Sequence, residues 1–432
     1  MANIIPIDIL NGIFQHCDFL TKIRFRQICK FLYNNLHIID FYYIKKKFLF
    51  KLTDDILKNY KFIRYLNAGH NKKIKNVSWM SDLKELDASG SCRITQLGIK
   101  GLDLIKLNSE KNKKIKNVSW MKNLKELNAG ESKIDQFGIK GLDLIKLNAN
   151  QNIKITNVSW MRNLKELNAG FSGIDQLGIK GLDLVKLNSR NNIQLNDISW
   201  MKNLKELDAS GSNCGIGQLE IEKLDLIKLK VCMNSKIMDV SWMKNLKVLY
   251  ASYPNCGIDQ LGIRGLDLIK LDAGNNPKII DVNWMKNLKE LYADNDSGIN
   301  QLGIRGLDLI KLAACNNPKI KNVSWMKNLK ELYASGNCGI DQLGIKGLDL
   351  IKLNVCNNPK IIDVNRLKNL KDLNAFGKNC GIDQLGIKGL DLVRLVTREN
   401  TKITDISWMR NLNELDASWE QFSSKMKNII FI

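Results

Sequence analysis

The stretch Leu104-Ile-Lys-Leu107-Asn-Ser109-Glu-Lys-Asn112-Lys-Lys-Ile115 recurs in varied form along most of this 432-residue chain. A second form, Leu329-Lys-Glu-Leu332-Tyr-Ala334-Ser-Gly-Asn337-Cys-Gly-Ile340, alternates with it. Both fit the pattern LxxLxLxxNxxL with a small residue at position six. Because LxxLxL places alternate apolar side chains on one face, each copy predicts a short strand. Eighteen copies, starting at Ile63 and ending with Leu412, predict a stack of such strands.

The copies pair into units of about 41 residues that are marked by a recurring tryptophan. The tryptophans are Trp79, Trp120, Trp160, Trp200, Trp242, Trp284, Trp325 and Trp408, and Arg366 fills the one empty place. The pattern resembles the leucine-rich-repeat family, in its short internalin-like class. The resemblance implies an α/β fold: a leucine-rich-repeat solenoid with a parallel concave β-sheet and a mostly 3₁₀ and extended convex side.

Several positions of the repeat have an expected structural role. The asparagine of the second-half copies, as in Asn71, Asn152, Asn276 and Asn400, is expected to satisfy backbone groups where the chain turns inward. The VSWMKNL segment predicts tryptophan and methionine side chains that point into the core, with the serine as the cap of one helical turn. The recurring GIKG or GIRG segment is interpreted as a turn, with an RNA-clamping loop as the alternative.

The first 40 residues do not share the repeat. Residues 4–14 predict a Pro-started amphipathic helix, and residues 23–36 predict a second helix. The segment resembles an F-box, whose pattern is LPxEILxxIF, a spacer, and RxVCKxWxxL. The matching residues are Pro6, Ile9, Leu10, Ile13, Phe14, Arg26, Ile28, Cys29, Lys30 and Leu36, whereas Ile5, Asp8, Cys17, Lys22 and Leu32 depart from it.

The F-box resemblance implies docking on the Skp-type adaptor of a cullin–RING ubiquitin ligase, through Pro6, Ile9, Leu10, Ile13, Phe14 and Ile28. The alternative is a helical cap that shields the first repeat. The expected organisation is an F-box-like helical segment (1–40), a connecting helix or cap (41–62) with Thr53 as N-cap, the solenoid (63–420), and a C-terminal cap or tail (421–432).

The net charge of +22 raises the question of an anionic partner. At repeat position three, glutamates such as Glu126 and Glu290 alternate with lysines such as Lys146 and Lys270, which predicts a self-neutralising ladder. The surplus lysines fall at strand starts and in the glycine turns, along the edges and back of the solenoid. Nucleic-acid binding is therefore the less favoured reading, and no membrane partner is expected.

Repeat position five is Asn or Asp in most first-half copies, but three consecutive ones carry Tyr250, Tyr292 and Tyr333. Val248 also replaces the usual glutamate at position three. Because tyrosine is over-represented at binding hot spots, we interpret this interval as the candidate target-binding part of the concave face. The alternative is drift among copies that look recently duplicated.

No catalytic constellation, cofactor loop or metal-ligand spacing is present in the sequence, so we expect neither an enzyme nor a cofactor. No secretory leader is evident, so the ten cysteines are interpreted as thiols of an intracellular protein. The abundance of Asn, Ile and Lys is typical of AT-rich genomes, such as those of some protists and of large DNA viruses that infect them. The combined hypothesis is a monomeric substrate-recognition subunit of an SCF-type ligase with an unknown protein target. The alternative is a leucine-rich-repeat scaffold without ligase association.

Overall fold

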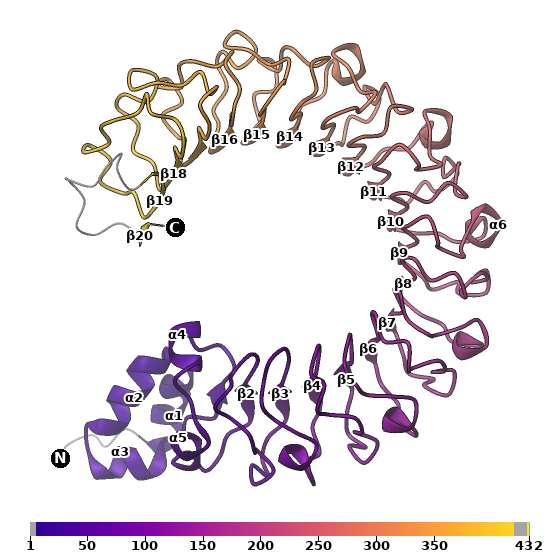
Figure 1. Ribbon diagram of the computed structural model, residues 1–432, viewed down its shortest axis with the longest axis vertical. Helices are drawn as coiled ribbons and strands as arrows, with labels where there is room; N and C mark the ends of the chain where they lie inside the picture. Colours follow the sequence, from indigo (N-terminus) through magenta and orange to yellow (C-terminus); the bar gives the residue numbers. More distant parts are fainter. Residues whose placement is uncertain (1–5, 419–429, 432) are drawn as a thin grey trace. The chain divides into compact units, whose positions relative to one another are not determined.

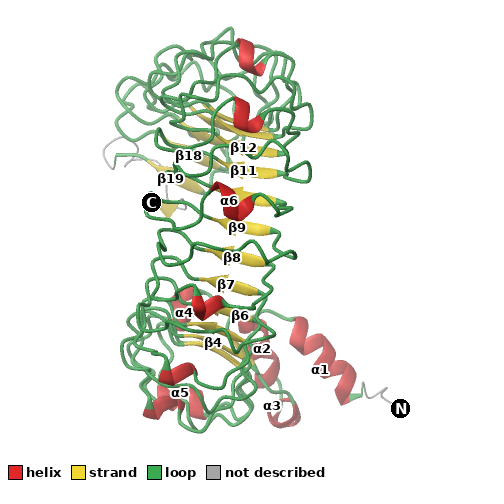
Figure 2. Cartoon of the chain, turned by 90° about the vertical axis from the view of Figure 1, so that its right-hand side faces the viewer, coloured by secondary structure: helices red, strands yellow, loops and turns green. Residues whose placement is uncertain are grey.

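The computed structural model describes residues 6–418 and 430–431, and it consists of two compact units, Met1–Leu204 and Lys205–Ile432. We describe each unit separately. In both, short parallel strands line the inner, concave side of the ribbon and turns line the outer side (Figure 1). Loops and turns make up most of both units, and the longer helices belong to the N-terminal segment (Figure 2).

Unit 1 begins with helices and continues as a parallel sheet. Its helices are α1 (Ile7–His16), α2 (Phe19–Gln27), α3 (Lys30–Asn35), α4 (Lys46–Leu49) and α5 (Asp54–Lys58). Its strands are β1 (Asp40–Phe41), β2 (Tyr65–Asn67), β3 (Glu85–Asp87), β4 (Lys106–Asn108), β5 (Glu126–Asn128), β6 (Lys146–Asn148), β7 (Glu166–Asn168) and β8 (Lys186–Asn188), each paired in parallel with the next. The 3₁₀ helices η1 (Leu97–Ile99), η2 (Phe137–Ile139) and η3 (Leu177–Ile179) lie between strands.

Unit 2 continues the same pattern. Its strands are β9 (Glu206–Asp208), β10 (Lys228–Lys230), β11 (Val248–Tyr250), β12 (Lys270–Asp272), β13 (Glu290–Tyr292), β14 (Lys311–Ala313), β15 (Glu331–Tyr333), β16 (Lys352–Asn354), β17 (Asp372–Asn374), β18 (Arg394–Val396), β19 (Glu414–Asp416) and β20 (Ile430–Phe431), again in parallel pairs. Helix α6 (Gln218–Ile221) and the 3₁₀ helices η4 (Leu261–Ile263) and η5 (Leu302–Ile304) lie on its outer side.

Each strand is three residues long in nearly every repeat, and its middle leucine is buried. In β12, for example, Leu271 is buried while Lys270 and Asp272 are partly exposed on the concave face. The flanking leucines and the small residue at position six, such as Leu268 and Ala273, are also fully buried. The predicted fold class is therefore confirmed: both units have the parallel architecture of a leucine-rich-repeat solenoid.

The recurring asparagine does what the sequence predicts. In unit 2, Asn276 donates through its side-chain nitrogen to the carbonyls of Ala251 (2.7 Å) and Ile258 (3.1 Å) and accepts from the amide of Lys278 (3.0 Å). Asn152 does the same in unit 1, with the carbonyls of Ala129 and Ile134 as acceptors. We call this row of buried amides the asparagine ladder: Asn71, Asn112, Asn152 and Asn192 in unit 1, and Asn234, Asn276, Asn317, Asn358 and Asn400 in unit 2, all 0–2% exposed.

The tryptophan row corrects an expectation. Trp79 is 37% exposed and the other recurring tryptophans are half-buried, whereas the methionines that follow them, such as Met121 and Met161, are fully buried. The indole nitrogen of Trp120 donates to the carbonyl of Leu102 at 3.0 Å, and other members of the row repeat this contact. A buried indole N–H needs an acceptor, so the ring braces one turn against the preceding one at the edge of the core.

The glycine turns form the outer side. A Cβ on Gly98 would lie only 2.4 Å from the carbonyl oxygen of Lys75, so this position requires glycine, and Gly101 has a positive φ of +81°. The large apolar residue at the start of each such turn points outward and is 68–77% exposed; it precedes the first glycine in seven copies and Glu220 in the eighth. We call this set the leucine row: Leu97, Phe137 and Leu177 in unit 1, and Leu219, Leu261, Leu302, Leu343 and Leu385 in unit 2.

The N-terminal helices differ in detail from the prediction. The second predicted helix is two helices, α2 and α3, because the chain is extended at Cys29 (φ −158°, ψ 163°). The connecting segment holds two short helices, and Thr53 caps α5 by accepting from the Ile56 amide at 3.2 Å, as expected. Most of the predicted C-terminal cap, 421–432, lies outside the described residues. Among those described, no helix is long and apolar enough to cross a bilayer.

The asparagine ladder should dominate local stability. Asn358→Ala leaves the carbonyls of Ala334 and Ile340 and the amide of Lys360 without partners, so we expect a loss of about 2–4 kcal/mol in unfolding free energy. Asn337 occupies the same repeat position in the preceding copy but is exposed, so Asn337→Ala should change it by less than about 0.5 kcal/mol. Urea denaturation of the full chain measures both, and equal losses would contradict the assignment.

Candidate binding surface

The concave face carries the predicted ladder of alternating charges at the first residue of each strand. In unit 1, Lys106 lies 3.3 Å from Glu126 and Lys146 lies 3.2 Å from Glu166. In unit 2 the pairs are Lys228–Glu206 (3.6 Å), Lys270–Glu290 (2.8 Å), Lys311–Glu331 (3.0 Å) and Lys352–Asp372 (3.0 Å). Such partly exposed pairs contribute about 0.2–1 kcal/mol each. The ladder is confirmed, and it balances much of the charge on this face.

The three tyrosines interleave with lysines in unit 2. The Lys270 ammonium lies 5.6 Å from the ring centre of Tyr250 and 5.1 Å from that of Tyr292. The Lys311 ammonium lies 5.6 Å from the Tyr292 ring and 5.2 Å from that of Tyr333. Lys230 and Lys352 contact the outer rings at 5.2 and 5.8 Å. We call Lys230, Tyr250, Lys270, Tyr292, Lys311, Tyr333 and Lys352 the tyrosine–lysine ladder.

The central lysines of this ladder are held in the charged form. Burial is the largest influence on the Lys270 ammonium and disfavours it, but the hydrogen bond to Glu290 and the nearby Tyr250, Tyr292 and Glu290 groups together outweigh burial, so the pKa of Lys270 is raised. Burial likewise disfavours the Lys311 ammonium, but the hydrogen bonds to Glu331 and Tyr292 and the nearby Tyr333 together outweigh it, so the pKa of Lys311 is raised. Each cation–π contact at a site of this exposure adds about 0.5–1 kcal/mol. The three rings are therefore held in place by fixed cations before any partner arrives.

The three tyrosines occupy a strand position at which most copies carry an Asn or Asp that makes a structural hydrogen bond. Where the third strand residue is Asn or Asp, its side-chain oxygen accepts from the backbone amide two residues later, at 2.9–3.1 Å. The acceptors are Asn67, Asp87, Asn108, Asn128, Asn148, Asn168 and Asn188 in unit 1, and Asp208, Asp272, Asn354 and Asn374 in unit 2. Tyr250, Tyr292 and Tyr333 cannot accept in this way, and such a bond contributes about 1 kcal/mol.

Two partly buried carboxyl groups lie beside the rings. Asp272 is paired in register with both Tyr250 and Tyr292, and Asp294 accepts from the Cys315 amide at 2.8 Å. Burial raises the pKa of Asp272 and of Asp294, although hydrogen bonds from the Gly274 and Cys315 amides oppose it. Both groups lose their negative charge at a higher pH than usual, so the ladder becomes more positive as the pH falls.

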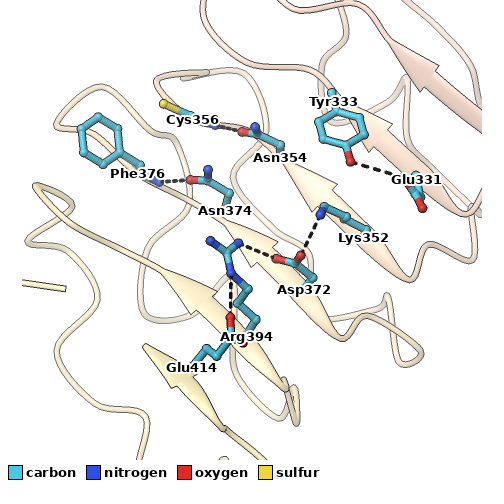
Figure 3. Close-up of polar contacts among 10 residues, drawn as sticks. All are labelled: Glu331, Tyr333, Lys352, Asn354, Cys356, Asp372, Asn374, Phe376, Arg394 and Glu414. Atoms are coloured by element: carbon cyan, nitrogen blue, oxygen red, sulfur yellow. Dashed lines mark hydrogen bonds and ion pairs between the residues drawn. The ribbon is translucent and has the colours of Figure 1, made fainter. Parts of the chain in front are cut away.

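Beyond the last tyrosine the face is again polar (Figure 3). The hydroxyl of Tyr333 donates to Glu331 at 3.2 Å. Arg394 bridges two carboxylates on neighbouring strands, at 3.1 Å from Asp372 and 3.2 Å from Glu414. Asn354 and Asn374 accept from the amides two residues later, as in the ordinary repeat. The tyrosine–lysine ladder is thus bounded by conventional, hydrogen-bonded copies.

The F-box-like residues lie mostly on the surface of the helical segment. Ile9 and Ile13 are 56% and 52% exposed on α1, with Pro6 exposed at its start and Leu10 half-buried. Ile28 is 67% exposed, at the end of α2. Phe14 is a correction: it is fully buried and packs 6.2 Å from the Phe25 ring, so it belongs to the core of the segment and not to its exposed face.

The sequence located the tyrosines but not their partners. Lys230 and the pair Asp272 and Asp294 join the surface through contacts across neighbouring strands. The lysine contacts could have been inferred from the repeat alignment, because long side chains at diagonal positions on adjacent parallel strands can reach each other. Among the described residues, no group of three or more His, Cys, Asp or Glu side chains could hold a metal ion. The arrangement offers aromatic area, cations and polar rims, which suit binding.

The sequence matches no protein-family model and no curated protein. Solved structures of low identity match in three dimensions. An internalin (InlF) of Listeria monocytogenes is 16% identical, with 71% of this chain and 85% of that chain covered at a TM-score of 0.34. The functional domain of InlJ from the same organism, which includes a cysteine ladder, is 18% identical, with 84% and 70% covered at 0.32.

A plant structure matches with a similar TM-score. The leucine-rich-repeat ectodomain of the Arabidopsis thaliana membrane receptor kinase GASSHO1/SCHENGEN3, solved in complex with CASPARIAN STRIP INTEGRITY FACTOR 2, is 14% identical to this chain. The match covers 84% of this chain and 42% of that chain, with a TM-score of 0.31.

The tyrosines should not be needed for folding. The triple variant Tyr250→Asn, Tyr292→Asn and Tyr333→Asn loses the cation–π contacts but regains the hydrogen bond that asparagine makes in the ordinary copies. We expect the two effects to cancel to within about 1 kcal/mol in the unfolding free energy, measured by urea denaturation. A loss of more than about 3 kcal/mol would show that the rings are structural.

Proposed function

We propose that this chain is a protein-interaction module that binds a protein target on the concave face of unit 2, at the tyrosine–lysine ladder. The observation that carries the proposal is the replacement of a hydrogen-bonding Asn or Asp by tyrosine at three successive first-half copies. Each replacement gives up a hydrogen bond that eleven other strands make. Lys230, Ala313 and Val396 also lack this acceptor, but only in the first-half copies of β11, β13 and β15 does the same aromatic residue take its place three times in succession.

The chemistry of the ladder favours a protein over a nucleic acid. Its central lysines already have carboxylate partners, Glu290 for Lys270 and Glu331 for Lys311, at 2.8 and 3.0 Å. A nucleic-acid surface needs cations that exchange small counter-ions for phosphates. Aromatic rings fixed in a polar frame are instead typical of the central residues of protein interfaces, where tyrosine supplies apolar contact and a hydroxyl together.

We further propose that the N-terminal segment recruits the Skp-type adaptor of a cullin–RING ubiquitin ligase, which would make the chain a substrate-recognition subunit. The F-box pattern supports this role, and so does the exposure of Ile9, Ile13 and Ile28. Large apolar side chains that remain exposed on short helices are typical of surfaces that a partner covers. The competing function is a repeat scaffold in which these helices only cap the first strands.

Target binding can be tested with the triple tyrosine variant. The full chain is immobilised, and bound proteins from a cell extract are quantified by mass spectrometry for wild type and variant. We expect the variant to capture at least tenfold less of each specific partner, because hot-spot residues contribute about 2 kcal/mol or more each to the binding free energy. The matched control is Leu261→Asn, Leu302→Asn and Leu343→Asn, which alters three exposed side chains on the outer side of the same unit. Equal capture by wild type and tyrosine variant would contradict the proposal.

Adaptor binding has a separate test. The full chain is mixed with a purified Skp-type adaptor, and affinity is measured by calorimetry. Ile9→Glu with Ile13→Glu places two charges on the exposed stripe of α1 and should weaken binding at least tenfold. Asn11→Glu introduces the same residue on another face of the same helix and should leave binding unchanged. If the wild-type chain does not bind the adaptor, the segment acts only as a cap.

A further inference from the structure

A small cavity lies between the N-terminal helices and the segment that leads into the first repeat. Its volume is about 190 Å³, and its walls come from the end of α2, from α3, and from residues 59–62 after α5. Pockets for drug-sized ligands are typically about 300–1,000 Å³. The cavity is therefore large enough for a small ion or one functional group, and too small for a peptide side chain with its backbone.

Arg26 lines this cavity with a charged group, and no carboxylate in the described part of the chain forms an ion pair with it. Its guanidinium donates one hydrogen bond, from Nη2 to the carbonyl of Tyr33 at 3.1 Å. Its Nε is buried and has no hydrogen-bond partner among the described residues. The guanidinium carbon lies 4.5 Å from the ring centre of Tyr33 and 5.7 Å from that of Tyr60. A guanidinium carries five N–H donors, so most of its donor capacity is unused.

Two further basic groups line the same cavity. His37 lies with its ring centre 4.5 Å from that of Phe62, and Lys61, the residue before Phe62, also lines the cavity. Burial, followed by the charges of Arg26 and Lys61, lowers the pKa of His37. No lining residue is an aspartate or a glutamate. The Phe62 ring packs against the imidazole, and the side-chain amide of Gln15 donates to the backbone carbonyl of His37 at 3.2 Å.

The basic side chains around this cavity lack a negative charge to balance them. A half-buried guanidinium normally has an anionic partner, because removing an unpaired charge from water is costly. Here three basic side chains from separate places in the chain, at positions 26, 37 and 61, line one cavity whose lining residues include no carboxylate. The missing component is an anion of small size that accepts several hydrogen bonds at once.

We propose that this cavity is a binding site for a small oxyanion that carries a phosphate group, held by the Arg26 guanidinium with Lys61 and His37 completing its coordination. Phosphate oxygens match the planar fork of arginine, which can donate two parallel hydrogen bonds to them. The rings of Tyr33 and Tyr60 and the hydrogen bond to the Tyr33 carbonyl already restrict the guanidinium, so little side-chain entropy is lost on binding. The bound anion would join the helical segment to the first repeat, independently of any target on the concave face.

The test uses the full-length chain with inorganic phosphate and with glycerol phosphate as probes, against chloride at the same ionic strength. We expect the midpoint of thermal unfolding to rise with the logarithm of the probe concentration, because a ligand that binds only the folded state stabilises it. A larger effect of inorganic phosphate would identify the free ion as the ligand, and a larger effect of the ester would identify a phosphate monoester. No difference between either probe and chloride would overturn the proposal.

Substitutions locate the binding. Arg26→Gln removes the charge but keeps a polar side chain of similar length, and it should weaken probe binding at least tenfold. Lys61→Gln changes an exposed residue whose loss does not threaten folding, and it should weaken binding about threefold to tenfold. Lys51→Gln removes an exposed lysine of the same unit that does not line the cavity and should have no effect. Unchanged binding in either of the first two variants would overturn the site.

Proton NMR of the histidines supplies an independent readout. The chain has three, so the imidazole signal of His37 can be assigned with His37→Gln. Without phosphate the protonated imidazole meets two other positive charges, and its pKa lies below the ordinary value. A bound anion offsets those charges, so the His37 signal should titrate at a higher pH in phosphate than in chloride. A titration that does not move would contradict an anion in this cavity.

Discussion

The buried asparagine amide is the interaction on which both units depend. A repeat of about 20 residues must turn back on itself within a short distance and satisfy the peptide groups that its turns bury. Asn276 and its equivalents donate to two carbonyls of the preceding copy and accept from amides of their own copy, so one side chain joins consecutive turns. A leucine core alone would bury the same apolar area without fixing this geometry. The strands, the turns and the register of the concave face all follow from this link.

The parts of the fold that depend on periodicity could be predicted from the sequence. The middle leucine of each strand, the asparagine ladder and the alternating Lys and Glu of the concave face occupy fixed repeat positions, and the structure places them as expected. Trp120 and its equivalents were placed in the core because they are apolar and periodic. They lie at its edge because the indole N–H requires the Leu102 carbonyl as acceptor, which a hydrophobic pattern does not reveal.

Features that arise from contacts between distant or diagonal residues could not be predicted in the same way. The end of α2 has no glycine or proline to mark it, and only the extended backbone at Cys29 separates α2 from α3. Burial of Phe14 depends on how α1 packs against α2, so its place in the F-box pattern did not distinguish a core residue from an exposed one. The tyrosines were visible in the sequence as a departure from the repeat. Their contacts with Lys270 and Lys311, and the convergence of Arg26 with Lys61, required three dimensions.

The alternation of charge on the concave face also limits how such a chain can grow or shrink. Removing a single turn of about 20 residues would bring two lysines, or two glutamates, onto adjacent strands. It would also place two copies with the buried asparagine, or two copies without it, next to each other, and so break the alternation of the asparagine ladder. Removing or inserting two turns together preserves both patterns. The heritable building block of this protein is therefore the pair of repeats, and gene duplication or slippage in steps of about 41 residues changes its length without disturbing its electrostatics.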